Sequence, residues 1–191
     1  MNTKYPKTAI QTYSGILIDL ANPRKEDILL PDIAHHLANT CRYSGACKWP
    51  YSVAQHSILV SKLVENYAPQ DKVMQLTGLM HDASEAYLGD VSTPLKTMLP
   101  EYRNLEGIFQ EVIRRRFGLY DIGIVKVFDS MALEFESKTL MGPRHPIWDG
   151  FKPEYPKDFD LDYTLTEIKP MSAIDVELEF LTRFNTLWRQ Q

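Results

Sequence analysis

Residues 52–67 read SVAQHSILVSKLVENY, and the apolar residues of this stretch recur with the period of an α-helix. They form one stripe, as in a helix that buries one face, and consist of Val53, Val60, Leu63 and Val64. His56 lies on the same stripe, with apolar residues one turn away on either side. Pro69 follows the stretch and ends it, because the residue before a proline avoids helical geometry. The stretch therefore predicts a helix with a histidine on its buried face.

Further helical patterns lie on either side of this stretch. Helices are expected over 33–43, 71–88, 101–117, 121–141 and 172–189, with a short extended segment at 13–20 and a turn or short helix opened by Ser92-Thr-Pro. The predicted buried stripe of the last helix consists of Ile174, Leu178, Leu181 and Trp188. In 121–141 the predicted stripe consists of Ile122, Val125, Ala132, Leu133 and Leu140, and Asp129 sits among them. We expect an all-α fold that forms a single domain over residues 1–191.

Residues 142–170 differ from the rest of the chain because prolines interrupt every regular pattern. The prolines are Pro143, Pro146, Pro153, Pro156 and Pro170, and the aromatic residues between them are Trp148, Phe151, Tyr155 and Phe159. So long a loop inside a compact domain is often functional. The alternative is a packed connector whose aromatic side chains cover the core.

Composition excludes several classes of protein. The chain has 191 residues, 25 acidic and 21 Lys and Arg residues, and a formal charge of −4. A general nucleic-acid binder is usually basic, so no nucleic-acid partner is expected. The two cysteines, Cys41 and Cys47, are too few for a disulfide framework and are expected to be reduced packing residues. With no long apolar run and no signal-like start, the expected location is the cytoplasm, without a membrane partner.

Ionisable residues in the predicted helices point to a metal. His81 and Asp82 are adjacent on the predicted 71–88 helix, and Glu85 follows one turn later on the same face. With His56 and Asp129, they offer the nitrogen and oxygen ligands that suit Mn, Fe, Co, Ni or Zn. Burying a carboxylate is costly unless it is paired or binds a metal. Two histidines and two aspartates leave positions open for water and substrate, which indicates a catalytic metal site.

The order His56, His81-Asp82, Asp129 resembles the H…HD…D signature of the HD-domain phosphohydrolases. The stretch HDASEAYLGDVSTPLK resembles the subgroup of 5′-deoxynucleotidases and phage deoxynucleotide phosphohydrolases, which includes a member acting on a nucleoside-analogue phosphate. The pattern of that subgroup matches His81, Asp82, Glu85, Asp90, Pro94 and Lys96, and its arginine followed by an aromatic residue matches Arg42-Tyr43. The resemblance covers about residues 13 to 141 and implies an HD-domain helical bundle.

The resemblance also implies roles for these residues. His56, His81, Asp82 and Asp129 would hold a divalent metal, either Co, Mn, Mg, Fe or Ni. Arg42 would grip phosphate oxygens, Lys96 would add a positive charge, and Glu85 or Asp90 would handle a proton. Tyr43 and an aromatic residue of the 142–170 loop would stack on the base. The expected substrate is a small nucleotide or nucleoside-analogue mono-, di- or triphosphate, and a homodimer is left open.

Other readings stay open for these residues and for the function. Arg42 could be a surface ion-pair residue, Lys96 a solvated turn residue, Asp90 a cap, and Glu85 a support for a ligand histidine. A triphosphohydrolase that releases triphosphate and a nucleotide-binding domain without turnover are the alternative functions. A two-iron oxygenase is disfavoured, because no histidine lies between His81 and His145 to supply further iron ligands.

Overall fold

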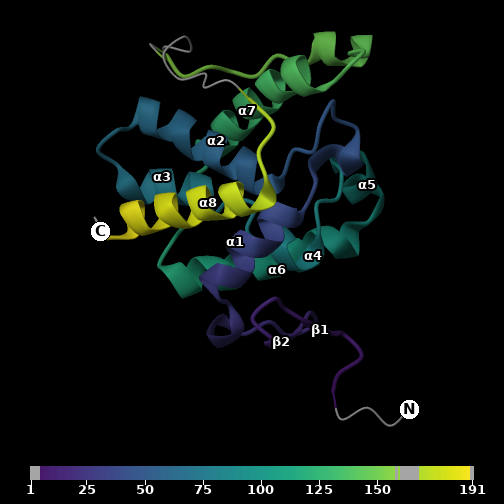
Figure 1. Cartoon of the computed structure of the whole chain (residues 1–191), viewed down its shortest axis with the longest axis vertical. Helices are drawn as coiled ribbons and strands as arrows, with labels where there is room; N and C mark the ends of the chain where they lie inside the picture. Colours follow the sequence, from purple (N-terminus) through teal and green to yellow (C-terminus); the bar gives the residue numbers. More distant parts are fainter. Residues whose placement is uncertain (1–4, 158, 160–167, 190–191) are drawn as a thin grey trace.

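The computed structural model describes residues 5–157, 159 and 168–189, and most of these residues are helical (Figure 1). The helices are α1 (Leu30–Asn39), α2 (Val53–Tyr67), α3 (Lys72–Leu79), α4 (Glu85–Leu88), α5 (Thr93–Met98), α6 (Pro100–Phe117), α7 (Val125–Leu140) and α8 (Ala173–Trp188). A small antiparallel hairpin, β1 (Ala9–Gln11) and β2 (Leu17–Asp19), precedes them with Ile10 opposite Ile18. The prediction of an all-α fold is confirmed.

Helix α2 lies at the centre and packs against α1, α3, α7 and α8. It begins with a capping box, in which the Ser52 hydroxyl accepts from the backbone of Gln55 and the Gln55 side chain accepts from the backbone of Ser52. The predicted stripe of α2, His56 included, is fully or almost fully buried. Arg183 of α8 donates hydrogen bonds to the hydroxyl and carbonyl oxygens of Ser61, which joins α8 to α2.

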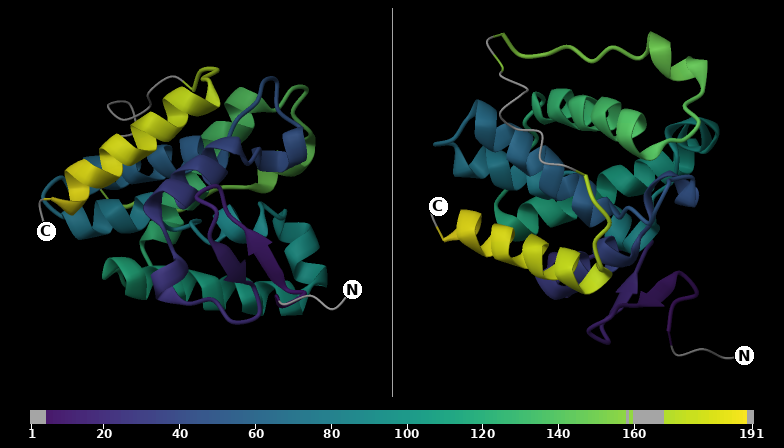
Figure 2. Two further views of the ribbon diagram at one scale, coloured as in Figure 1. Left: turned by 60° about the horizontal axis from the view of Figure 1, so that its bottom comes forward. Right: turned by 45° about the horizontal axis from the view of Figure 1, so that its top comes forward.

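Two apolar clusters flank this central helix. The larger lies among α1, α3, α6 and α8 and contains Phe109 and Phe180, both fully buried. The smaller lies between α2 and α7 around Phe128. Figure 2 shows the consequence: α7 lies across one side of α2, whereas α1 and α8 cover another. The face of α2 that carries His56 therefore lies between helices that are each held in place by one of the two apolar clusters.

The prediction of an unbroken helix over 71–88 is wrong, because α3 ends at Leu79 and α4 begins at Glu85. The side chain of Gln110, on α6, lies in the gap. Its Nε2 donates to the Met80 carbonyl at 2.7 Å, and its Oε1 accepts from the Ser84 N–H at 3.1 Å. In a continuous helix those two backbone groups would bond to each other. An amide inserted into the backbone ladder is a known cause of a helix break.

Three other boundaries differ from the predictions. Helix α1 runs over Leu30–Asn39 rather than 33–43, because Pro31 stands in its first turn and the chain is extended from Thr40. In this extended segment, Cys41 forms an isolated antiparallel β-bridge with Ser52. Helix α7 begins at Val125 rather than at 121, and the expected extended segment at 13–20 is reduced to the three residues of β2.

The predicted buried stripe of α8 is only partly right: Leu181 is half-buried against the larger cluster, whereas Ile174, Leu178 and Trp188 are exposed. Ile174 is 70% exposed and Leu178 57% exposed. The residues that face the core are Val176, Phe180, Phe184 and Leu187. Both sets have helical spacing, so periodicity alone does not separate them. The face that contains the two phenylalanines is buried because α8 packs against α1 and α3 with that face.

The described part of the 142–170 loop is a packed connector at two points. Phe159 contacts Phe128, with ring centroids 5.8 Å apart, and the Tyr155 hydroxyl donates to Glu134. Residues 158 and 160–167 of the loop lie outside the described residues. Cys41 is exposed and Cys47 half-buried, so the expectation of a packing role fails for Cys41. Within the described ranges, no helix is both long and apolar enough to cross a membrane.

Replacing Phe180 by alanine tests which face of α8 is buried. We expect Phe180→Ala to lower the free energy of unfolding by about 3–5 kcal/mol, because it opens a cavity in the larger apolar cluster. Ile174→Ala, on the exposed face, should change it by no more than about 0.5 kcal/mol. Urea denaturation followed by circular dichroism measures both. Equal losses would show that the two faces contribute equally.

Candidate metal centre

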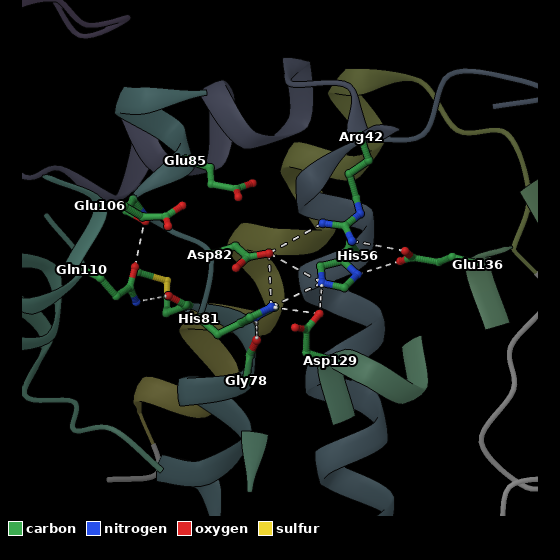
Figure 3. A network of polar contacts seen from close by, with 12 residues as sticks. Arg42, His56, Gly78, His81, Asp82, Glu85, Glu106, Gln110, Asp129 and Glu136 are labelled. Carbon is green, nitrogen blue, oxygen red and sulfur yellow. Dashed lines mark hydrogen bonds and ion pairs between the residues drawn. The ribbon is translucent and has the colours of Figure 1, made fainter. Parts of the chain in front are cut away.

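Four side chains meet in the space between α2, α7 and the turn after α3 (Figure 3). His56 comes from α2, Asp129 from α7, and His81 and Asp82 from the turn that Gln110 opens. The two Nε2 atoms of the histidines lie 3.3 Å apart. Asp82 Oδ2 lies 3.6 Å from His56 Nε2 and 3.2 Å from His81 Nε2. Asp129 Oδ1 lies 3.1 Å and 3.8 Å from the same two nitrogens.

Hydrogen bonds on the other side of each ring decide which nitrogens face this space. His81 Nδ1 lies 2.8 Å from the Gly78 carbonyl oxygen, which can only accept, so Nδ1 carries the hydrogen. His56 Nδ1 lies 2.6 Å from a carboxylate oxygen of Glu136 and donates to it in the same way. In the neutral form of each ring, Nε2 is therefore an unprotonated acceptor. Both lone pairs then point at the space that the two aspartates share.

This arrangement of acceptors fits a cation. Two imidazole lone pairs and two carboxylates at these distances repel one another unless a positive charge lies among them. The electrostatics favour a positive charge here: burial lowers the pKa of His81, but Asp82 and Asp129 raise it well above its usual range. Ligand atoms of His56, His81 and Asp82 lie within 4.8 Å of one another, so these three can hold one metal ion. Nitrogen and oxygen donors suit a divalent ion.

The sequence predicts that Asp129 lies on the buried stripe of its helix and joins the metal ligands. The structure brings it to both histidines but leaves it more exposed than predicted. Its side chain is 41% exposed, so it does not lie on a fully buried stripe. The buried residues around it on α7 are Val125, Phe128, Met131 and Ala132. Asp129 sits at the solvent edge of this face and reaches both histidines from there. It is therefore placed to join the three-residue set from its open side.

Glu136 is the buried residue that the sequence analysis missed. It follows Asp129 by seven residues, which places both on one face of α7 (Figure 3). Its carboxylate is fully buried and accepts from the hydroxyls of Tyr43 at 2.5 Å and Tyr51 at 2.9 Å, besides His56. Burial raises its pKa, but the charges of His56 and Arg42 outweigh this and hold it at about 2. The heptad spacing from Asp129 was the signal available in the sequence.

Arg42 and Tyr43 lie beside the centre in a short turn. The Arg42 guanidinium lies 3.6 Å from Asp82 and 3.4 Å from Glu136, and the residue is 9% exposed, so the surface ion-pair alternative is wrong. The Tyr43 ring lies under this guanidinium at 5.2 Å, with its hydroxyl on Glu136. Tyr43 has a φ of 56°, an uncommon backbone conformation for a non-glycine residue. The turn thus directs both side chains towards the buried carboxylate.

Glu85 and Lys96 form a second group next to the centre. Glu85 is 4% exposed, and Lys96 Nζ lies 3.0 Å from its Oε1. Burial, together with the charges of Asp82 and Asp90, raises the pKa of Glu85 to about 8. Glu85 is therefore a candidate for a carboxyl group that keeps its proton near neutrality. The prediction placed it on a continuous helix with His81, whereas it begins α4 beyond the break.

Lys96 is not a solvated turn residue, because its ammonium is bonded to two carboxylates. Besides Glu85 it contacts Glu106 of α6 at 2.5 Å. Its charge is thus already paired within the protein. Asp90 is partly buried. Its pKa is raised, because burial and the charge of Asp82 outweigh the lowering effect of Arg42. Glu106 and Gln110 are further neighbours of the site that the sequence analysis missed, since both come from α6 and nothing in their own segment links them to the motif.

Comparisons with known proteins identify two relatives. The chain is 41% identical over 133 residues to the uncharacterized protein YfdR of Escherichia coli, a match that covers 69% of this chain and 71% of YfdR. It is 34% identical over 139 residues to the uncharacterized protein RCAP_rcc00048 of Rhodobacter capsulatus, covering 68% of this chain and 71% of that protein. No family model matches the chain.

Removing a histidine ligand should empty the site. We expect His81→Ala to lose bound metal, since one of the three convergent donors disappears. His145→Ala is the matched control, because His145 is exposed and belongs to the loop. Elemental analysis after dialysis against Mn, Co or Zn measures both. The wild type should also melt at a higher temperature with metal than with a chelator. Full metal content in His81→Ala would contradict the site.

Changing Glu136 to glutamine should weaken metal binding without removing a donor. The amide is the same size but carries no charge. Its oxygen at the Oε1 position can still accept from His56 Nδ1 and Tyr51, though more weakly than a carboxylate, and its NH₂ group at the Oε2 position cannot accept from Tyr43. A group that orients a ligand histidine typically contributes about 10–100-fold to metal affinity. Glu134→Gln, two residues earlier on the same helix and bonded to Lys138, is the control. Competition with a fluorescent chelator measures the affinity. Equal affinities in a folded Glu136→Gln protein would show that Glu136 does not position His56.

Proposed function

We propose that this chain, which belongs to the same family as Escherichia coli YfdR, is a metal-dependent phosphohydrolase that removes phosphate from a nucleotide or nucleoside-analogue phosphate. The observation that carries the proposal is the convergence of His56, His81 and Asp82 as metal donors, with the buried carboxyl group of Glu85 three residues beyond Asp82. Metal ligands next to a proton donor are the parts that hydrolysis of a phosphate ester requires. The H…HD…D resemblance supports the same reaction class.

The metal donors and Arg42 account for the neutralisation of charge that phosphate hydrolysis requires. His56, His81, Asp82 and Asp129 would hold a divalent ion, which would supply polarisation of a phosphoryl oxygen and a lowered pKa of the attacking water. Arg42 adds a fixed positive charge at the edge of the set, 3.6 Å from Asp82. Phosphoryl transfer depends mainly on positioning and on neutralising charge, so a guanidinium at this place favours a phosphate substrate. Glu136 holds Arg42 there from the opposite side.

Glu85 acts as the general acid in this proposal and donates a proton to the leaving group. Lys96 donates to Oε1 of Glu85, so a proton on this carboxyl group resides on Oε2. That proton passes to the leaving oxygen as the bond between phosphorus and oxygen breaks and the water oxygen bonds to phosphorus, and a proton lost by the attacking water then restores the acid form of Glu85. Lys96 thereby has a positioning role rather than the direct phosphate contact expected from the sequence. A buried carboxyl group beside the donors favours an enzyme over a nucleotide-binding domain without turnover, because binding alone requires no proton donor.

Glu85→Gln separates proton transfer from binding. We expect the variant to keep its metal and its fold and to lose turnover by about 10²–10⁴-fold, because the amide preserves shape but cannot carry the proton. Glu101→Gln, exposed at the start of α6, is the matched control. Phosphate release from nucleoside mono-, di- and triphosphates, with Mg, Mn or Co, measures turnover. Activity close to that of the wild type would remove Glu85 from the mechanism, and release of triphosphate would favour the alternative reaction.

A further inference from the structure

Helix α8 carries a second apolar stripe, on the side that its own fold leaves open. Figures 1 and 2 show this helix on the outside of the bundle. Ile174 is 70% exposed, Leu178 57% and Trp188 41%, and Leu181 between them is half-buried. Single exposed apolar residues are common on protein surfaces, but a continuous row of large ones marks an interaction surface.

The spacing of this outer stripe is that of two helices packed side by side. With Asn185 included, its members follow one another at steps of four, three, four and three residues. This is the heptad spacing of paired helices, in which a single polar residue in the seam fixes the register of the pair. The fold of the chain itself does not need this spacing, because α8 packs on the core with a different face. The outer stripe therefore fits another helix.

The charges along α8 change sign from its first half to its second. The first half carries Asp175, Glu177 and Glu179, and the second half and the C-cap carry Arg183 and Arg189. Glu177, Glu179 and Arg183 are already paired with residues of α1 and α2. Within the part of the chain that the structure describes, Asp175 bonds to Ser172 but, like Arg189, has no ion pair. One exposed charge of each sign is thus left, at opposite ends of the stripe.

These two charges are placed to match a second copy of the same helix. Asp175 and Arg189 each lie seven residues from Thr182, and the heptad spacing puts all three on one side of the outer stripe. A two-fold axis at Thr182 runs the two helices in opposite directions and brings each Asp175 level with the Arg189 of the other copy. Parallel helices would instead place Asp175 beside Asp175, which is repulsive.

The same axis also lets the apolar side chains interleave. Leu178 then falls between the levels of Asn185 and Trp188 of the other copy, and Leu181 falls between its Leu181 and Asn185. We propose that the outer stripe of α8 is a homodimer interface, in which two copies of α8 pack antiparallel about a two-fold axis. A two-fold dimer requires one self-complementary surface, and both the charges and the apolar spacing of this stripe are self-complementary. The proposal is independent of the proposed function, since α8 supplies none of the metal donors.

The size of the interface predicts a reversible dimer. A helix of 16 residues is about 24 Å long, so a single helix pair lies at the small end of specific interfaces. The exposed ring of Tyr13 adjoins the stripe, because it stacks on His35, which bonds to Glu177 of α8. We therefore expect a dissociation constant on the order of micromolar. Sedimentation velocity over a range of protein concentrations measures it.

Exchanging the two charges tests both the partner and its direction. Asp175→Arg and Arg189→Asp should each raise the dissociation constant by about 5- to 30-fold, because two attractive pairs per dimer become repulsive. The protein that carries both changes should return close to the wild-type value, because the pairs are restored with opposite signs. Tighter association of Asp175→Arg than of the wild type would refute the antiparallel arrangement. Melting curves followed by circular dichroism check that all three variants are folded.

A charge in the middle of the stripe tests the apolar contact. Leu178→Glu should be monomeric at every concentration at which the wild type is dimeric, because the glutamate would be buried without a partner. Ile108→Glu, at a similarly exposed apolar residue of α6, is the matched control and should dimerise normally. A wild-type protein that stays monomeric up to its solubility limit would overturn the proposal, and so would a dimer that Leu178→Glu leaves intact. A monomer that hydrolyses nucleotides would refute the interface alone, whereas a dimer without hydrolysis would refute only the proposed function.

Discussion

The hydrogen bond from His56 to Glu136 is the interaction on which the site depends. Both side chains are fully buried, and a carboxylate in such a place is destabilising unless its oxygens are satisfied. Tyr43, Tyr51 and Arg42 satisfy the remaining positions of Glu136, so one carboxylate joins α2, α7 and the turn that follows α1. The same contact fixes the His56 tautomer and turns Nε2 towards the donors.

A second constraint comes from α6, through the amide of Gln110. By taking up the backbone groups of Met80 and Ser84, it lets the chain leave the helix where His81 and Asp82 must turn towards α2. The Gly78 carbonyl, freed by the end of α3, then holds the His81 ring. A helix break that would be a defect elsewhere thus supplies two of the donors. Stability and site geometry rest on the same hydrogen bonds.

The paired charges around Glu85 show how the fold separates two kinds of carboxylate. Asp82 lies against the imidazoles of His81 and His56, which lower its pKa although burial and Asp129 raise it. Glu85 is also buried, but Asp82 and Asp90 are its charged neighbours, and Lys96 shares its charge with Glu106. One carboxylate is therefore available as a ligand and the other as an acid. Pairs of acids with pKa values pushed apart in this way are typical of sites that transfer protons.

The sequence by itself determined the helical class, the position of α2 and its buried histidine, and the residues of the donor set, because these follow from local periodicity and from an ordered motif. It predicted neither the break after α3 nor the face of α8 that is buried. The break depends on Gln110, 26 residues beyond Ser84, and the choice of face depends on what α8 packs against. The contacts of Glu136 and the pairing of Lys96 were likewise decided only by tertiary structure. Each of them joins side chains from separate elements, and hydrophobic periodicity describes only one element at a time.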